Sequence, residues 1–299
     1  MRWKIIQGAL ALLFTFLAFY IGHRLIGPRE SEERPIDSPE KPKYILYTLP
    51  LYHVQKLEER GFEKDEIMEI NEALERHRKT DAYRQFSNPI PLNDFFLLAT
   101  YASVVVGGDI DPLVLTGVHY AETIKKIGVG ECSFVPDKEG VFGLVRGASG
   151  DDSERFQRRF EAEKAAFLEI FKKINTHLRN PRYRMQAYWP LASCGAGALG
   201  PMQIMPSNWV RYERVICREI CGSLRVVYAS PYHIIPAIFG AALILKDVAR
   251  AFRVEPASVQ LDDPETVKLI SAGYYAGPRN AVFHVKGYGA LVYRNSLRA

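Results

Sequence analysis

The chain has 299 residues, a formal net charge of +5 and a pI near 8.9, and 24% of its residues are charged. This length suits one large domain or two small ones with a sizeable core. The lysines and arginines are spread beside acidic residues, without a dense basic tract or interleaved aromatic platform, so nucleic acid is not expected as a partner. A mildly basic surface suits an anionic polymer or phospholipid headgroups equally well.

The N-terminus predicts a membrane anchor. Residues 5–21 are apolar with two polar exceptions, a length at the short limit of the about 20 residues that span a bilayer. Because no convincing cleavage site follows, residues 1–26 are expected to form an uncleaved, single-pass signal anchor rather than a signal peptide or a buried core helix. Arg2 and Lys4 favour an N-terminus inside, which would place the rest of the chain outside the cytoplasm, although arginines on the other flank oppose this orientation.

The segment after the anchor changes from linker to helix. Residues 27–50 are rich in proline and charge and predict a linker. Apolar spacing from about residue 51 to residue 78 predicts helix, so that residues 51–92 are expected to form a helical juxtamembrane spacer or small subdomain. No residue in it has an evident chemical role. The apolar positions are Leu57, Phe62, Ile67, Ile70 and Leu74.

The next helix carries the candidate acid. An Asp-Pro pair at 111–112 predicts a helix start, and the helix is expected to run over residues 113–129. Its apolar stripe, continued by three or four residues, leads to Glu131. A carboxyl group there would be partly desolvated, which raises its pKa and suits an acid catalyst, although a helix-end carboxylate with a structural partner is the alternative. Glu122 lies nine residues earlier, half a revolution away, and is expected to face solvent.

Residues 136–152 predict a glycine-rich loop, and residues 153–179 predict a helix whose aromatic stripe is expected in the core. The most informative motif of the chain follows them. It runs Cys-Gly-Ala-Gly-Ala-Leu-Gly-Pro-Met-Gln-Ile-Met-Pro over residues 194–206. Its glycines allow a tight turn or a close approach of another chain, and Gln203 needs a hydrogen-bonding partner if it is buried. Ser207 is expected to cap the helix that carries Trp209.

The C-terminal third predicts more helices and no strands. Apolar spacing favours a helix over residues 232–251 and another from residue 264 to residue 273, which leads into Tyr-Tyr-Ala-Gly-Pro at 274–278. The chain has no alternating strand pattern worth counting and no internal repeat. The predicted fold class is therefore all-α.

Three of these elements resemble the lytic transglycosylases of the lysozyme-like superfamily, in order and in form. They are Glu131 at a helix end, Gly-Ala-Leu-Gly-Pro-Met-Gln-Ile-Met-Pro at 197–206, and Ala-Gly-Tyr-Tyr-Ala-Gly-Pro at 272–278. The resemblance covers roughly residues 93–295. Cys132 follows the acid where the soluble-type family has Ser, and Tyr275 replaces the usual Asn. The long segment before the glycine motif is also similar to the membrane-bound B-type enzymes.

This resemblance implies a lysozyme-like catalytic domain over residues 93–299, acting on peptidoglycan glycan strands from the cytoplasmic membrane, within the periplasm or cell-wall space. Glu131 would protonate the glycosidic oxygen between N-acetylmuramic acid and N-acetylglucosamine. The substrate's acetamido group would help to stabilise the cation, and the carboxylate would then take a proton from the C6 hydroxyl to close a 1,6-anhydro ring. No cofactor or metal is implied. Substrate-binding residues would be Gly200, Met202, Gln203, Tyr274 and Tyr275.

The four cysteines, Cys132, Cys194, Cys217 and Cys221, lack the clustered spacing of a metal site. Outside the cytosol they are expected to form disulfides, with three possible connectivities. A bridge between Cys132 and Cys194 is predicted because it would tether the candidate acid to the glycine motif, and Cys217 could then pair with Cys221.

Two other functions remain open at this stage. A goose-type lysozyme would use water as the nucleophile and a further carboxylate to position it, for which the chain offers Asp137, Glu139, Asp151 and Asp152. The other alternative is an inactive, membrane-anchored glycan-binding scaffold within a cell-envelope or secretion complex.

Overall fold

The computed structural model describes residues 49–78, 90–124, 135–136, 142–143, 161–163, 165–170, 172–173, 198–221, 229–231 and 233–299, and all of them belong to one compact unit. They are mostly helical, which confirms the predicted all-α class. Within these ranges, β structure is limited to the antiparallel pair β1 (Val135–Pro136) and β2 (Phe142–Gly143) and to one bridge between Leu199 and Ile204. The predicted anchor at 1–26 lies outside the described residues.

Within the described ranges, no single helix combines the length and the apolar character needed to cross a membrane. One bent pair of helices, Leu92–Gly107 and Pro112–Glu122, meets the criterion jointly by length and composition alone, with an angle of 116° between its two parts.

The helical pattern predicted over residues 51–78 forms two helices, α2 (Leu51–Glu59) and α3 (Lys64–Arg78), separated by a turn at Gly61. α3 packs on α5 (Leu92–Ala102), where the Asp94 carboxylate accepts hydrogen bonds from Arg76 at 2.7 and 3.0 Å and pairs with His77 at 2.7 Å. Four of the five predicted apolar positions are at most 1% exposed and the fifth packs against the core, which confirms the apolar pattern. The four are Leu57, Ile67, Ile70 and Leu74.

The helix predicted to start at residues 111–112 is confirmed as α6 (Pro112–Ile124). The Asp111 side chain accepts a 2.8 Å hydrogen bond from the backbone N–H of Leu113, which satisfies one of the unpaired donors at the start of the helix. A short π-helix, η1 (Ser103–Gly107), connects α5 to the turn before α6. α6 packs against both α5 and α12 (Ala290–Ser296).

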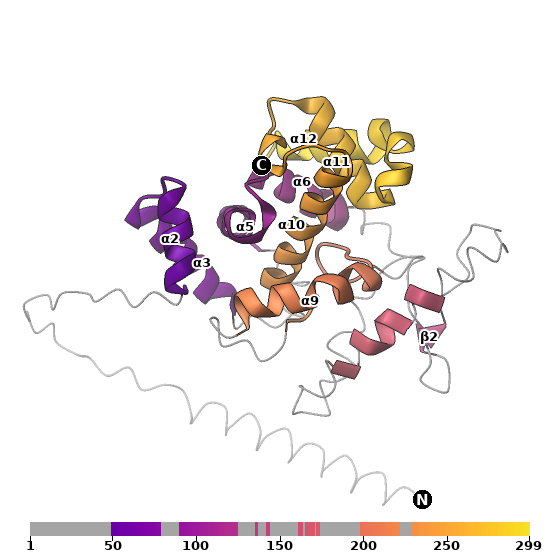
Figure 1. Ribbon diagram of the computed structural model, residues 1–299, viewed down its shortest axis with the longest axis horizontal. Helices are drawn as coiled ribbons and strands as arrows, with labels where there is room; N and C mark the ends of the chain where they lie inside the picture. Colours follow the sequence, from indigo (N-terminus) through magenta and orange to yellow (C-terminus); the bar gives the residue numbers. More distant parts are fainter. Residues whose placement is uncertain are drawn as a thin grey trace, which may run out of the picture. The chain divides into compact units, whose positions relative to one another are not determined.

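The core is built around α10 (Ile234–Ala251), which packs against α5, α9 (Pro206–Ile220) and α11 (Pro264–Ala276) (Figure 1). α10 carries few polar residues on any side, and a helix of this kind is buried all round. Its N-terminal part, residues 234–245, is buried without interruption. The predictions of helices at 232–251 and 264–273 are therefore confirmed, with α11 extending to Ala276.

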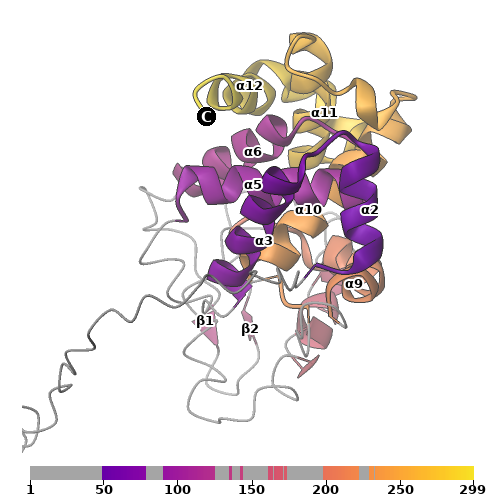
Figure 2. The same cartoon turned by 90° about the vertical axis from the view of Figure 1, so that its left-hand side faces the viewer.

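The C-terminal segment returns to cover α6. After η5 (Pro256–Ser258) and α11, a 3-10 helix η6 (Pro278–Phe283) and a π-helix η7 (Val285–Gly289) lead into α12. Figure 2 shows α11 and α12 beside α6, and α12 packs closely along α6. This return brings Glu122 and Tyr288, which are 166 residues apart in the chain, into contact.

Candidate active site

Glu122 lies near the C-terminal end of α6, and a tyrosine holds its carboxylate. The phenol of Tyr288, a residue that is 4% exposed, donates a 2.6 Å hydrogen bond to Oε1 of Glu122. The expectation that Glu122 faces solvent is therefore wrong. It assumed one buried face for this helix, whereas residues 114–118 are all buried. The available signal was the absence of charge over residues 112–118, because a helix that is apolar all round is buried all round.

The glycine motif forms a tight turn closed by two backbone hydrogen bonds between Leu199 and Ile204, of 2.7 and 2.9 Å. Gly200 has φ +69°, which glycine adopts without a steric penalty. Gln203 has φ +52°, which is uncommon for residues other than glycine. Such a strained backbone conformation persists only where the surrounding structure compensates for its cost. Its backbone N–H and side-chain amide both donate to the Gly200 carbonyl, at 3.1 and 2.7 Å. The turn predicted from the glycines is confirmed.

Side chains of α6 and α11 hold this turn from outside. Tyr274 of α11 donates a 2.5 Å hydrogen bond to the carbonyl oxygen of Met202, and Nδ1 of His119 in α6 lies 3.3 Å from the carbonyl oxygen of Pro201. Because His119 precedes Glu122 by three residues, it lies one helical turn away on the same side of α6. The turn is thus fixed to the two helices that carry Glu122 and Tyr274.

Three tyrosines gather around Glu122. Tyr275 stacks on Tyr288 with ring centroids 4.6 Å apart and 17° between the planes. Burial raises the pKa of the Tyr274 and Tyr288 phenols well above its ordinary value, and the negative charge of Glu122 raises it further. Both phenols therefore remain protonated at neutral pH and act as hydrogen-bond donors.

The start of α9 fixes the other end of the glycine motif. The helix begins at Pro206 rather than after Ser207, and Met205 is its N-cap residue without a side-chain cap. Ser207 instead donates from its backbone N–H and its hydroxyl to the buried carboxylate of Glu163, at 2.9 and 2.6 Å. The predicted capping role of Ser207 is therefore wrong, because a carboxylate 44 residues away satisfies the donors of this first turn.

The predicted site residues are brought together in part. Gly200, Met202, Gln203 and Tyr274 lie in or on the turn beside α6, and Tyr275 is stacked next to Tyr288. Met202 is fully buried, whereas Tyr275 is 49% exposed. A contact of either residue with a sugar stays a prediction.

The remaining predictions of site residues concern the candidate acid and the cysteines. Glu131, Cys132 and Cys194 lie outside the described residues, so the acid role of Glu131 and the bridge between Cys132 and Cys194 stay predictions. Cys217 and Cys221, at the end of α9, have Cα atoms 4.7 Å apart and sulfur atoms within bonding distance. The Cα separation of this second pair lies within the range found in disulfides.

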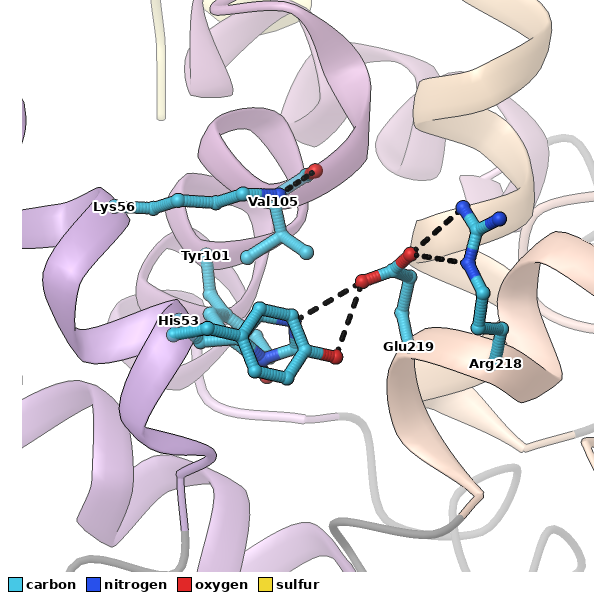
Figure 3. A network of polar contacts seen from close by, with 7 residues as sticks. His53, Lys56, Tyr101, Val105, Arg218 and Glu219 are labelled. Atoms are coloured by element: carbon cyan, nitrogen blue, oxygen red, sulfur yellow. Dashed lines mark hydrogen bonds and ion pairs between the residues drawn. The ribbon is translucent and has the colours of Figure 1, made fainter.

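A buried polar network that the sequence did not reveal joins α2, α5 and α9 (Figure 3). His53, which is 0% exposed, shares a 2.6 Å hydrogen bond through Nδ1 with the Tyr101 hydroxyl, and its Nε2 lies 3.3 Å from Oε2 of Glu219. Tyr52 also donates to Glu219 at 3.2 Å, and Arg218 pairs with its other oxygen at 2.9 Å. The network therefore attaches the first described helix to the helix that follows the glycine motif.

The charge state of this network follows from its burial. Burial lowers the pKa of His53 below its ordinary value, despite the opposing effect of the hydrogen bond to Glu219. Burial alone would raise the pKa of Glu219, but the hydrogen bonds from His53, Arg218 and Tyr52 outweigh it and leave the pKa lowered. At neutral pH the arrangement is thus a neutral imidazole whose Nε2–H donates to a carboxylate, and whose Nδ1 accepts from Tyr101.

Comparisons of the chain with protein-family models, with curated proteins and with solved structures found no match. Within the described part of the chain, no group of three or more His, Cys, Asp or Glu side chains is arranged to hold a metal ion.

Proposed function

We propose that the chain is a peptidoglycan lytic transglycosylase with a lysozyme-like catalytic domain, and that Glu122 is its acid and base. The observation that carries this proposal is the arrangement of three segments. The Glu122 carboxylate accepts a hydrogen bond from Tyr288, and α6 and α11 both hold the Gly-Pro-Met-Gln turn. The glycine motif and the Tyr-Tyr-Ala-Gly-Pro motif, whose resemblance to this family comes from sequence, thus meet beside a carboxylate.

The proposed acid differs from the one that the sequence pattern favours. Glu122 is chosen because its helix contacts the glycine motif through His119 and its charge acts on Tyr274 of the second motif, whereas Glu131 lies outside the described residues. Assignment of the acid to α6 agrees with the resemblance equally well, since the family places its glutamate near the end of a helix that precedes the glycine motif.

The chemistry needs one carboxyl group that acts twice. Protonated Glu122 gives its proton to the glycosidic oxygen as the bond to the leaving sugar breaks, and the acetamido oxygen of the substrate stabilises the cationic centre. The resulting carboxylate then removes the proton of the C6 hydroxyl, which restores the acid form of Glu122. The C6 oxygen bonds to the anomeric carbon and closes the 1,6-anhydro ring. No second carboxylate is required, in contrast to glycosidases that use two.

Tyr288 would support the second half of this cycle. A phenol that stays protonated can donate to the carboxylate that forms once the proton has left, and a hydrogen bond to an ionised group is stronger than one between neutral groups. It also fixes the direction of Oε1, and general acid–base catalysis depends on such placement. Gly200 would let the backbone of the turn approach the glycan, and Gln203 would supply polar contacts to the sugar.

The proposed setting is the cell envelope. Residues 5–21 would anchor the chain in the cytoplasmic membrane, with the catalytic domain facing glycan strands outside it, alone or within an envelope complex. A disulfide between Cys217 and Cys221 would fit this setting, because disulfides form mainly outside the cytosol.

The acid is tested by digestion of purified peptidoglycan with the full-length protein and with Glu122→Gln and Glu131→Gln variants. We expect release of muropeptides by the wild type and by Glu131→Gln, and a fall of about 100-fold or more in Glu122→Gln. Loss of activity only in Glu131→Gln would return the acid to that residue. If none of the three proteins released muropeptides, while all bound glycan, the anchored scaffold would be the better account.

A further inference from the structure

The carbonyl groups of the Leu199–Ile204 turn are nearly all engaged, some within the turn and others by side chains of neighbouring helices. Within the turn, Leu199 accepts from the N–H of Ile204, and Gly200 accepts twice from Gln203. The next two carbonyls are held by side chains of other helices, that of Met202 by Tyr274 and that of Pro201 by His119. His119 is therefore the only one of these partners that lies on the same helix as Glu122.

The imidazole of His119 is itself fixed in orientation. It stacks on Phe95 of α5 with ring centroids 4.3 Å apart and 9° between the planes, and Phe95 is 1% exposed. A carbonyl oxygen accepts hydrogen bonds and cannot donate them, so Nδ1 of His119 carries the proton in this contact. The stacked ring thus aims one N–H from α6 at the Pro201 carbonyl.

We propose that His119 is a positioning residue that sets the distance between Glu122 and the turn that carries Met202 and Gln203. This inference rests on the proposed function of Glu122. α6 carries both side chains, three residues apart, so the hydrogen bond from His119 fixes the turn relative to the acid through one rigid element. Catalytic steps tolerate little error in such a distance, because displacements of about 1 Å can cost about 100-fold in rate.

Two substitutions separate the hydrogen bond from the packing. His119→Phe keeps an aromatic ring that can stack on Phe95 and removes the donor. His119→Asn removes the ring and keeps an amide N–H close to the place of Nδ1. Rates are measured on peptidoglycan with the full-length protein, as kcat and KM per folded molecule, with the folded fraction taken from calorimetry of the same samples.

We expect kcat/KM to fall about 3- to 10-fold in His119→Phe, the loss that corresponds to one neutral hydrogen bond. The fall should lie mainly in kcat, because a turn displaced relative to Glu122 misplaces the bound sugar with respect to the acid. His119→Asn should recover at least half of the loss in the logarithm of kcat/KM, even though its thermal stability should be lower than that of His119→Phe. A purely structural role would lower the folded fraction and leave both KM and the kcat per folded molecule unchanged.

The outcomes distinguish this inference from the proposed function. An active wild type with an unchanged His119→Phe variant, or an Asn variant no better than Phe, would refute the positioning role and leave the proposed function intact. A wild type that releases no muropeptides would refute the proposed function, and the inference with it.

Discussion

The substitution Gly289→Ala tests whether the packing of η7 on α11 holds Tyr288 in place. Its φ of −58° is open to any residue, so the need for glycine here is spatial. A methyl group at this position would overlap the backbone carbonyl of Lys268, which cannot move without displacing α11. Overpacking of this kind costs about 1–3 kcal/mol. For a domain of this size, that lowers Tm by about 2–12 °C in Gly289→Ala.

Gly287, two residues earlier in the same π-helix, is the matched control. A methyl group there would meet no atom within 4 Å. Gly287→Ala should therefore leave the packing intact and raise the free energy of unfolding by up to about 0.5–1 kcal/mol, because alanine loses less backbone entropy on folding.

Calorimetry of the full-length variants measures both effects, and peptidoglycan digestion of the same samples reports on the site. Gly289→Ala should lose activity per folded molecule, since Tyr288 precedes the displaced residue and donates to Glu122. Gly287→Ala should retain it. Equal Tm values for the two variants would show that η7 adapts to the added methyl group, and that the close contact of Gly289 with Lys268 does not require glycine.

Two further predictions concern stability. Because the pKa values of His53 and Glu219 are both lowered in the folded protein, their contribution is present at neutral pH and is lost as the pH falls below about 6.5 for the histidine and below about 4.5 for the carboxyl group. Calorimetry from pH 7 to 5 should show a smaller decrease of Tm in His53→Gln than in the wild type, and an equal or larger decrease would contradict this. Glu163→Ala should lower the free energy of unfolding by about 1–3 kcal/mol, because it removes the two hydrogen bonds that Ser207 donates to this carboxyl group. The exposed Glu169, in the helical residues 165–170, should change it by less than about 0.5 kcal/mol when replaced by Ala, and equal effects would remove the special role of Glu163.

Features set by neighbouring residues could be predicted from the sequence. The Asp-Pro pair at 111–112 fixes the start of α6 because its capping hydrogen bond spans two residues. The tight turn before α9 follows from Gly200 and the amide of Gln203, three residues apart. Apolar spacing likewise identified Ile67, Ile70 and Leu74 as buried.

Features that depend on distant partners could not be predicted. The absence of charge over residues 112–118 indicates a helix buried on more than one side, but the partner of Glu122, Tyr288, lies 166 residues away, and no local pattern predicts that contact. The same holds for the start of α9, where Ser207 donates its hydrogen bonds to the carboxylate of Glu163, 44 residues earlier in the chain. The sequence places His53 in a helical spacer with no evident chemical role. Its hydrogen-bonding partners, Tyr101 and Glu219, lie 48 and 166 residues away in the chain, so no local pattern predicts them.

The most direct test of the proposed reaction is the oxygen balance of its product. Full-length protein would digest peptidoglycan in water enriched in ¹⁸O, and the muropeptides would be weighed by mass spectrometry, with Glu122→Gln as the inactive control. If the C6 hydroxyl is the nucleophile, the new sugar ends will be lighter than hydrolysis products by one water and will carry no ¹⁸O. Products of full hydrolytic mass that carry one ¹⁸O at the new sugar end would contradict the account and assign the chain to water-using, lysozyme-type chemistry.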